Sequence, residues 1–268
     1  SSLGKTTFIH QMGDQLAAAG DHVLFFSLEQ NRLEMVTKSL SRITARHNKN
    51  TAVSAINMRS GRINAEVLAA AEEYNKIADR VSVVECNFNT NIGFILDYTK
   101  EYMAANPGIK PIIIVDYLQI IPPTDPRQSD KEKVDHIVRG LKKLQSDNDL
   151  VIFVVSSINR ANYLSPIDFE SFKESGGIEY TADVVWGLQL QVLNDDLFNK
   201  DTKIKEKREK VREAKKANPR KIELLCLKNR YGVSSYSCGF NYTPQFDLFE
   251  VDYNYKDDDE KPYSEKRR

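Results

Sequence analysis

Helical and strand-like patterns of apolar residues alternate along most of the chain. Apolar positions at helical spacing precede Gly20, which is typical of a helix end, and they are Phe8, Ile9, Met12, Leu16 and Ala19. Helical spacing recurs at residues 31–47, 64–78, 92–106 and 133–148. Strand-like apolar segments lie at residues 22–29, 81–86, 111–121, 150–159 and 182–192. This alternation predicts an α/β fold with a mainly parallel sheet flanked by helices.

The last third of the chain has a different pattern. Residues 221–242 alternate apolar and polar side chains around a Tyr231-Gly232 turn, which predicts antiparallel strands at the C-terminal edge of the sheet. The segment 197–219 is polar and rich in helix formers, and we expect it to be a basic helical insertion. We predict one domain over residues 1–250 and a charged tail over residues 251–268.

Charge and composition restrict the function only loosely. The net charge is zero, but residues 200–221 contain 11 lysines and arginines against 4 acidic residues. No apolar run approaches the roughly 20 residues of a transmembrane helix, so we expect no membrane association. The three cysteines form no C-x-x-C pair and the four histidines are scattered, so we expect no structural metal site. Reduced cysteines favour a cytoplasmic protein.

The chain opens with "SSLGKTT", which contains the second half of the phosphate-binding pattern G-x-x-x-x-G-K-[ST]. The spacing places the first residue of that pattern two positions before Ser1, so we expect a fragment or a start within the motif. Gly4 allows close approach of the backbone to phosphate, Lys5 can reach the β- and γ-phosphates, and the Thr6 hydroxyl can ligate Mg²⁺. The candidate nucleotide-binding residues of this loop are Ser2, Leu3, Gly4, Lys5, Thr6 and Thr7. The alternative is a surface turn.

Two acidic residues follow apolar strands. Asp116 ends "PIIIVD" and Glu29 ends "FFSLE", so both are expected at the carboxyl edge of a parallel sheet, where ligands bind. Asp116 could hold Mg²⁺, and Glu29 could accept a proton from an attacking water. The alternatives are a loop or capping aspartate for Asp116 and an acid at a helix N-terminus for Glu29.

Taken in order, the motifs resemble those of the C-terminal motor domain of DnaB-type replicative DNA helicases, which has a RecA-like P-loop fold. The resemblance extends to about Glu250 and is carried by "SSLGKTT" (1–7), "FFSLEQ" (25–30), "IIIVDYLQII" (112–121), "SSINR" (156–160), "FKESGGIEYTADVVW" (172–186) and "LKNRYG" (227–232).

The resemblance implies an ATP hydrolase that uses ATP and Mg²⁺, forms a hexameric ring and moves along single-stranded DNA. It implies that Lys5, Glu29 and Asp116 serve nucleotide in their own subunit, together with Thr6. Lys228 and Arg230 would serve the nucleotide of the neighbouring subunit as catalytic groups, since arginine offers fixed, permanently charged donors to developing phosphate charge. A primase or a helicase loader is an expected partner.

By position, two segments resemble the family's DNA-binding loops, residues 122–133 and 160–175. Candidate phosphate contacts there are Arg127, Lys131, Lys133 and Lys173, and plain surface charge is the alternative.

The chain departs from the family at Ser157, which stands where the family has a sensor glutamine and cannot supply an amide at the same reach. The segment 197–219 is also longer and more basic than the family's core. A second hypothesis is therefore a module that holds ATP, binds DNA or a partner and hydrolyses weakly. A third is a recombinase-type ATPase, against which "DYLQI" and "KNRYG" argue.

Overall fold

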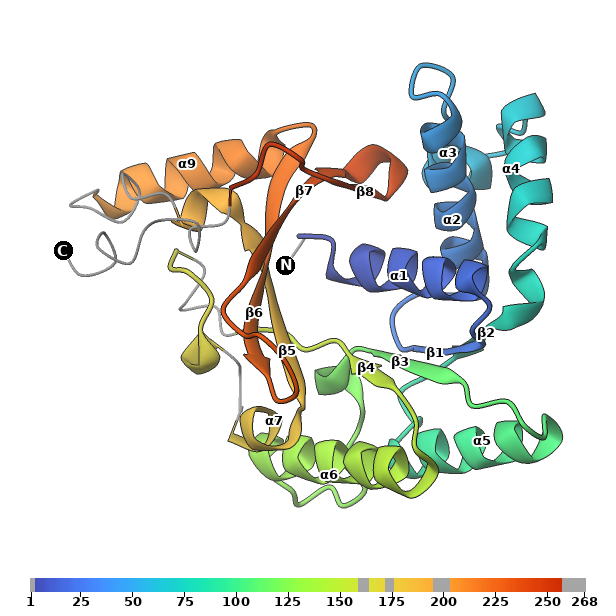
Figure 1. Ribbon diagram of the computed structural model, residues 1–268, viewed down its shortest axis with the longest axis vertical. Helices are drawn as coiled ribbons and strands as arrows, with labels where there is room; N and C mark the ends of the chain where they lie inside the picture. Colours follow the sequence, from blue (N-terminus) through green and yellow to red (C-terminus); the bar gives the residue numbers. More distant parts are fainter. Residues whose placement is uncertain (1–2, 159–163, 172–175, 195–202, 257–268) are drawn as a thin grey trace.

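The computed structural model describes residues 3–158, 164–171, 176–194 and 203–256. Its architecture is α/β, with a parallel sheet flanked by helices and an antiparallel sheet beside it (Figure 1). The fold class expected from the sequence is thereby confirmed, although the strands form two sheets rather than one.

The parallel sheet has the strand order β2-β1-β3-β4. Its strands are β1 (Val23–Ser27), β2 (Val81–Glu85), β3 (Ile112–Asp116) and β4 (Ile152–Val154). Every residue of β1 is buried, as expected for a strand covered on both faces. Leu24 and Phe26 pack with α5 (Ile92–Ala105) and α6 (Asp130–Asn148), whereas Val23 and Phe25 pack with α1 (Lys5–Ala19) and α2 (Arg32–His47) on the opposite face.

Helices cover both faces of this sheet (Figure 1). The long helices are α1 (Lys5–Ala19), α2 (Arg32–His47), α4 (Ala65–Asn75), α5 (Ile92–Ala105) and α6 (Asp130–Asn148), and the short ones are α3 (Ala55–Arg59) and α7 (Gly176–Thr181). Capping boxes at Asn31 and Ser129 fix the starts of α2 and α6 by satisfying backbone N–H groups. The single-turn 3₁₀ helices cover Ala78–Arg80, Leu118–Ile120, Phe169–Ser171, Gln191–Asn194 and Pro244–Phe246.

The antiparallel sheet has the order β5-β6-β7-β8. Its strands are β5 (Val184–Leu190), β6 (Arg220–Asn229), β7 (Ser237–Thr243) and β8 (Leu248–Val251). The Tyr231-Gly232 turn joins β6 to β7, as predicted. The strand at 182–192 was expected in the parallel sheet, but β5 pairs antiparallel with β6 instead. Its apolar spacing predicts a strand and not the partner of that strand.

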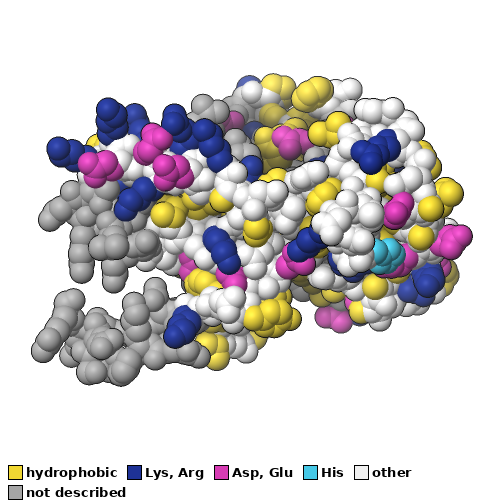
Figure 2. Space-filling model, turned by 90° about the horizontal axis from the view of Figure 1, so that it is seen from above, with side chains coloured by type: hydrophobic (Ala, Val, Ile, Leu, Met, Phe, Trp, Pro, Cys, Tyr) yellow, Lys and Arg dark blue, Asp and Glu magenta, His cyan; other side chains and the backbone are white. Residues whose placement is uncertain are grey.

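A helix, α9 (Ile204–Lys216), lies within the predicted basic insertion. Its Val211 is buried in a cluster with residues of the antiparallel sheet, and its outer surface carries interspersed basic and acidic side chains (Figure 2). The expected domain limits, with the insertion at 197–219, remain predictions, and most of the predicted tail lies outside the described residues. In the described part of the chain, no helix combines the length and apolar character needed to span a membrane.

Candidate functional site

The loop before α1 has a backbone conformation and a close packing that only glycine can adopt at Gly4. Gly4 caps α1 at a φ of 84°, in the left-handed region that favours glycine. A Cβ at Gly4 would lie 2.9 Å from the Tyr242 ring and 3.0 Å from that of Phe249. Both the conformation and the space therefore require glycine. Lys5 and Thr6 follow in the first turn of α1, where backbone N–H groups can bind an anion.

The two predicted acids emerge at the same sheet edge. Asp116 ends β3 and lies in register with Ser27, the last residue of β1. The Leu28 amide donates to the Asp116 carbonyl at 3.0 Å, and Glu29 follows one residue later with an exposed side chain. The parallel pairing of β1 and β3 thus brings the two acids to one edge, as the sequence predicted.

A cleft of about 1100 Å³ lies against this edge. The predicted loop and acidic residues that line it are Leu3, Gly4, Lys5, Thr6, Thr7, Glu29 and Asp116. The cleft continues between β4 and β5, where its walls are mainly apolar and the Phe153 and Trp186 rings stack with centroids 6.2 Å apart. Ser2 lies outside the described residues.

Burial dominates the electrostatics of the site. It raises the pKa of Asp116, which is 1 % exposed, from its ordinary 3.8 to about 6. Glu29 raises that pKa further, while a hydrogen bond from Thr6 and the charges of Lys5 and Lys38 oppose the rise. Burial also lowers the pKa of Lys5, against the opposing effect of Asp116 and Glu29. In the cleft, the nearby positive charges do not offset the cost of burying the Asp116 carboxylate, and the Lys5 amine is also largely removed from solvent.

Replacing Asp116 with asparagine should stabilise the protein when metal and nucleotide are absent. Because the pKa of Asp116 is higher in the folded state, its stability contribution is present at low pH and is lost as pH rises from about 3.8 to about 6. Asp116→Asn should raise the free energy of unfolding by about 3 kcal/mol at pH 8 and by about half that at pH 5. Urea unfolding in EDTA at both pH values measures the difference in unfolding free energy between the variant and the wild-type protein.

The control is Asp21→Asn, at an exposed position just after α1, which should leave the unfolding free energy near wild type at both pH values. The burial argument would be contradicted if Asp116→Asn changed the unfolding free energy equally at pH 5 and pH 8, or if the variant were less stable than the wild-type protein.

The structure adds site residues that sequence reasoning missed. Lys38 of α2 lines the cleft and pairs with Asp247 at 3.4 Å, and Asp247 also accepts a hydrogen bond from Thr7 at 3.0 Å. Tyr242 lines the same cleft against Gly4. No local pattern in the sequence marks Lys38, because its partner Asp247 lies near the other end of the chain.

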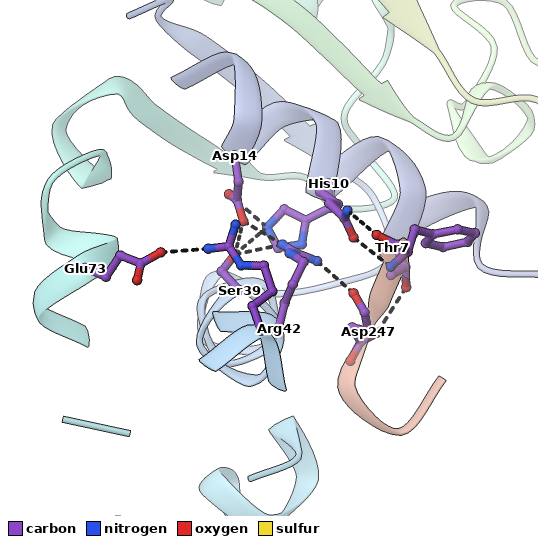
Figure 3. A network of polar contacts seen from close by, with 10 residues as sticks. Thr7, His10, Asp14, Ser39, Arg42, Glu73 and Asp247 are labelled. Atoms are coloured by element: carbon purple, nitrogen blue, oxygen red, sulfur yellow. Dashed lines mark hydrogen bonds and ion pairs between the residues drawn. The ribbon is translucent and has the colours of Figure 1, made fainter. Parts of the chain in front are cut away.

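A buried polar network holds α1, α2 and the turn before β8 together (Figure 3). Arg42, 3 % exposed, pairs with Asp14 at 2.5 Å and donates to the Asp247 carbonyl at 3.0 Å. Ser39 donates to Asp14 at 2.6 Å and contacts His10, whose pKa burial lowers to about 4. Helix α1 carries Lys5 and α2 follows Glu29, so this network fixes the two helices on which the site depends.

The position of the family's sensor glutamine also lines the cleft. The Ser157 amide donates to Gln119 Oε1 at 3.0 Å, and Gln119 Nε2 donates to Ser156 Oγ at 2.8 Å. The side-chain amide of Gln119 therefore links the segments that follow β3 and β4. It lies next to Ser157, whose side chain has no amide group. Sequence reasoning did not assign a role to Gln119.

Lys228 lies near the end of β6 and Arg230 directly follows that strand, and both contact their own chain. The Lys228 amine donates to the Glu179 carbonyl at 2.6 Å, and Arg230 pairs with Asp183 at 2.7 Å. Neither belongs to the described residues that line the cleft. Their proposed action on a neighbouring subunit stays a prediction.

The candidate DNA-binding residues differ in how available they are. Arg127 is 89 % exposed and pairs with Asp125, and Lys131 is exposed at the start of α6. Lys133 is only 14 % exposed, and its amine contacts the Gln119 carbonyl at 3.2 Å. Lys173 lies outside the described residues. DNA contact by these residues stays a prediction, with Arg127 and Lys131 the most accessible.

Solved structures share this fold. One of them, described as an ATPase domain, superposes with a TM-score of 0.74 at 20% sequence identity, covering 94% of this chain and 81% of that one. A DnaB-like replicative helicase, solved in work on its interactions with primase, superposes with a TM-score of 0.73 at 20% identity, covering 93% of this chain and 55% of that chain.

Sequence comparison points to one family. The replicative DNA helicase DnaB of Helicobacter pylori is 25% identical over 258 residues, and the match covers 87% of this chain and 50% of that protein. That of Leifsonia xyli is 27% identical over 191 residues, covering 69% and 39% respectively. The chain therefore spans half or less of these relatives. Residues 1–251 match the family model described as the DnaB-like helicase C terminal domain. With the phosphate loop, the strand-end acids and the fold in agreement, the chain belongs to the DnaB-like helicase C-terminal domain family.

Proposed function

We propose that this chain is the ATP-driven motor of a replicative DNA helicase, which translocates on single-stranded DNA and unwinds duplex DNA as a hexameric ring in the cytoplasm. The observation that carries the proposal is the convergence of Lys5, Thr6, Glu29 and Asp116 at one cleft. A phosphate-binding amine, a hydroxyl and two carboxylates are the groups that nucleotide hydrolysis needs.

The residues present fit Mg²⁺ with ATP. Among the described residues, Asp116 Oδ1 is a buried oxygen with no hydrogen-bond partner, and the Thr6 hydroxyl lies next to the same carboxyl group. Oxygen ligands of this kind suit Mg²⁺. Bound there, Mg²⁺ would supply positive charge that neutralises developing negative charge on the phosphates.

Each protein group then has a separate task. Lys5 binds the β- and γ-phosphates, and the N–H groups that follow Gly4 bind phosphate oxygens. Glu29 orients a water and accepts its proton. Lys228 and Arg230 act on the nucleotide held by the next subunit, where Arg230 stabilises charge that develops during hydrolysis.

DNA and protein partners follow from the same proposal. The segments 122–133 and 160–175 are the proposed DNA-binding segments, with Arg127, Lys131, Lys133 and Lys173 as phosphate contacts. A primase is a proposed partner because a DnaB-like relative was solved in work on its interactions with primase. A helicase loader is the other candidate.

The proposal is tested by ATP turnover with and without single-stranded DNA. We expect Mg²⁺-dependent turnover that DNA stimulates, and loss of nucleotide binding or turnover in Lys5→Ala. The matched control is Lys100→Ala, an exposed lysine on α5. Strand displacement with one polarity would separate a helicase from a recombinase-type ATPase. Wild-type turnover in Lys5→Ala would refute the phosphate-loop assignment.

Ser157 favours a second candidate, a module that holds ATP and binds DNA or a partner while hydrolysing poorly. The two candidates differ in one measurement. The module should bind ATP through Lys5 with turnover that single-stranded DNA does not raise, whereas a motor should accelerate on DNA.

A further inference from the structure

The carboxylate of Asp183 joins two cations that come from distant parts of the fold. Its Oδ1 pairs with Arg230 Nη1 at 2.7 Å, and its Oδ2 pairs with Lys142 Nζ at 2.6 Å. The Arg230 amide also donates to the Asp183 carbonyl at 2.9 Å. Asp183 therefore holds both the backbone and the guanidinium of Arg230, while its second oxygen ties it to α6.

The end of α7 also contacts Lys228, near the end of β6, and Arg230, which follows that strand. Arg230 Nη2 donates to the Tyr180 carbonyl at 3.3 Å, and Lys228 donates to the Glu179 carbonyl at 2.6 Å. Arginine carries five N–H donors, and the guanidinium contacts described here engage two of its nitrogens. Arg230 is 42 % exposed, so its head group is oriented and still faces solvent.

Close packing holds α7 against α6. A Cβ at Gly177 of α7 would clash with Asp135 Oδ1, so the backbone of α7 approaches α6 directly. Ile178 packs against the core cluster that contains Val134 and Ile137 of α6. Helix α6 itself begins after Ser129, in the segment 122–133 proposed to face DNA.

We infer that Asp183 is a positioning residue for Arg230, and that its pair with Lys142 makes the orientation of Arg230 depend on α6. The inference rests on the proposed action of Arg230 on a neighbouring nucleotide. A guanidinium acts on phosphate only at a defined distance and direction, and a small misplacement of such a group is costly. Asp183, which with Lys142 also lines the cleft of its own chain, sets that distance and direction through its pair with the guanidinium.

The test is a double-mutant cycle in the intact protein, measured as ATP turnover with single-stranded DNA. Asp183→Asn replaces the carboxylate that pairs with Arg230 and Lys142 by a neutral amide. It should lower kcat by about 10- to 100-fold with little change in KM for ATP. In an Arg230→Ala background the same substitution should cost nothing further, because its effect passes through Arg230. Lys142→Met should lower kcat less, again only when Arg230 is present, and it serves if Asp183→Asn does not fold.

The matched control is Asp252→Asn, which breaks the 2.8 Å pair with Lys221 at the opposite end of β6 and should keep wild-type kcat. Unchanged or raised kcat in Asp183→Asn overturns the inference, and unchanged kcat in Lys142→Met overturns the dependence of Arg230 on α6. A further loss in the Arg230→Ala background also overturns it, since it indicates a general structural role. Wild-type kcat in Arg230→Ala would refute both this inference and the proposed role of Arg230, whereas a damaged Arg230→Ala with an intact Asp183→Asn refutes this inference alone.

Discussion

Glu29→Gln should bind ATP like the wild-type protein but hydrolyse it about 100- to 10,000-fold more slowly, the range expected for loss of a general base. Glutamine keeps the size of the side chain and its ability to accept a hydrogen bond from water, but it cannot take the proton. Binding should survive because Lys5, the backbone N–H groups after Gly4 and Asp116 are untouched. Nucleotide binding by fluorescence or calorimetry and turnover by phosphate release separate the two effects.

The chain offers a matched control at the same sheet edge. Glu85 ends β2, in register with Ser27, but its carboxylate accepts a hydrogen bond from the Arg32 amide at 2.7 Å and is not among the described residues that line the cleft. Glu85→Gln should therefore turn over ATP normally. Equal losses in Glu29→Gln and Glu85→Gln would indicate a structural effect, and wild-type turnover in Glu29→Gln would assign the base elsewhere.

Arg230→Ala should lower ATP turnover by about a thousandfold or more while nucleotide binding is retained, which is the effect of removing an arginine that stabilises phosphoryl-transfer charge. Arg230 directly follows β6, is held by Asp183, and is not among the described residues lining the cleft of its own chain. The charge is therefore proposed to act across a subunit interface.

Mixing two inactive variants tests delivery between subunits. Rings assembled from Arg230→Ala and Glu29→Gln subunits contain some interfaces where an intact Glu29 faces an intact Arg230. Mixing should therefore restore part of the ATP turnover, and Arg62→Ala, an exposed arginine between α3 and α4, should behave as wild type alone and in mixtures. If the two variants exchange subunits and mixing restores nothing, Arg230 does not act in trans.

The long helices and the strand-end acids could be predicted from local sequence, whereas the short helices α3 and α7 were not predicted. Residues 31–47 and 92–106 were expected as helices, and α2 and α5 occupy them to within a residue because amphipathic spacing reports one buried face. Asp116 and Glu29 were expected together because parallel strands end at one edge, whatever the order of the strands. That part of the site needed only the direction of β1 and β3.

The pairing of strands was not determined by spacing alone. Residues 182–192 carry apolar side chains that suit a strand in either sheet, and β5 joins the antiparallel sheet because β6 returns beside it after α9. Likewise the apolar run 150–159 predicts a strand, yet only Ile152–Val154 forms one, at the edge of the parallel sheet, and Val151 and Val154 are exposed. An apolar pattern indicates which face of a strand is buried. The strands with which that strand pairs depend on contacts between residues distant in sequence.

The sequence by itself determined the chemistry of the site, since Gly4, Lys5, Thr6, Glu29 and Asp116 belong to short motifs whose spacing sets their geometry. Only the tertiary structure decided which distant groups surround and hold them. The pairs Lys38 with Asp247 and Arg230 with Asp183 join residues far apart in the chain, and so does the contact of Tyr242 with Gly4. Charged and polar partners of this kind have no periodicity to reveal them, because they are matched by the packing of whole elements.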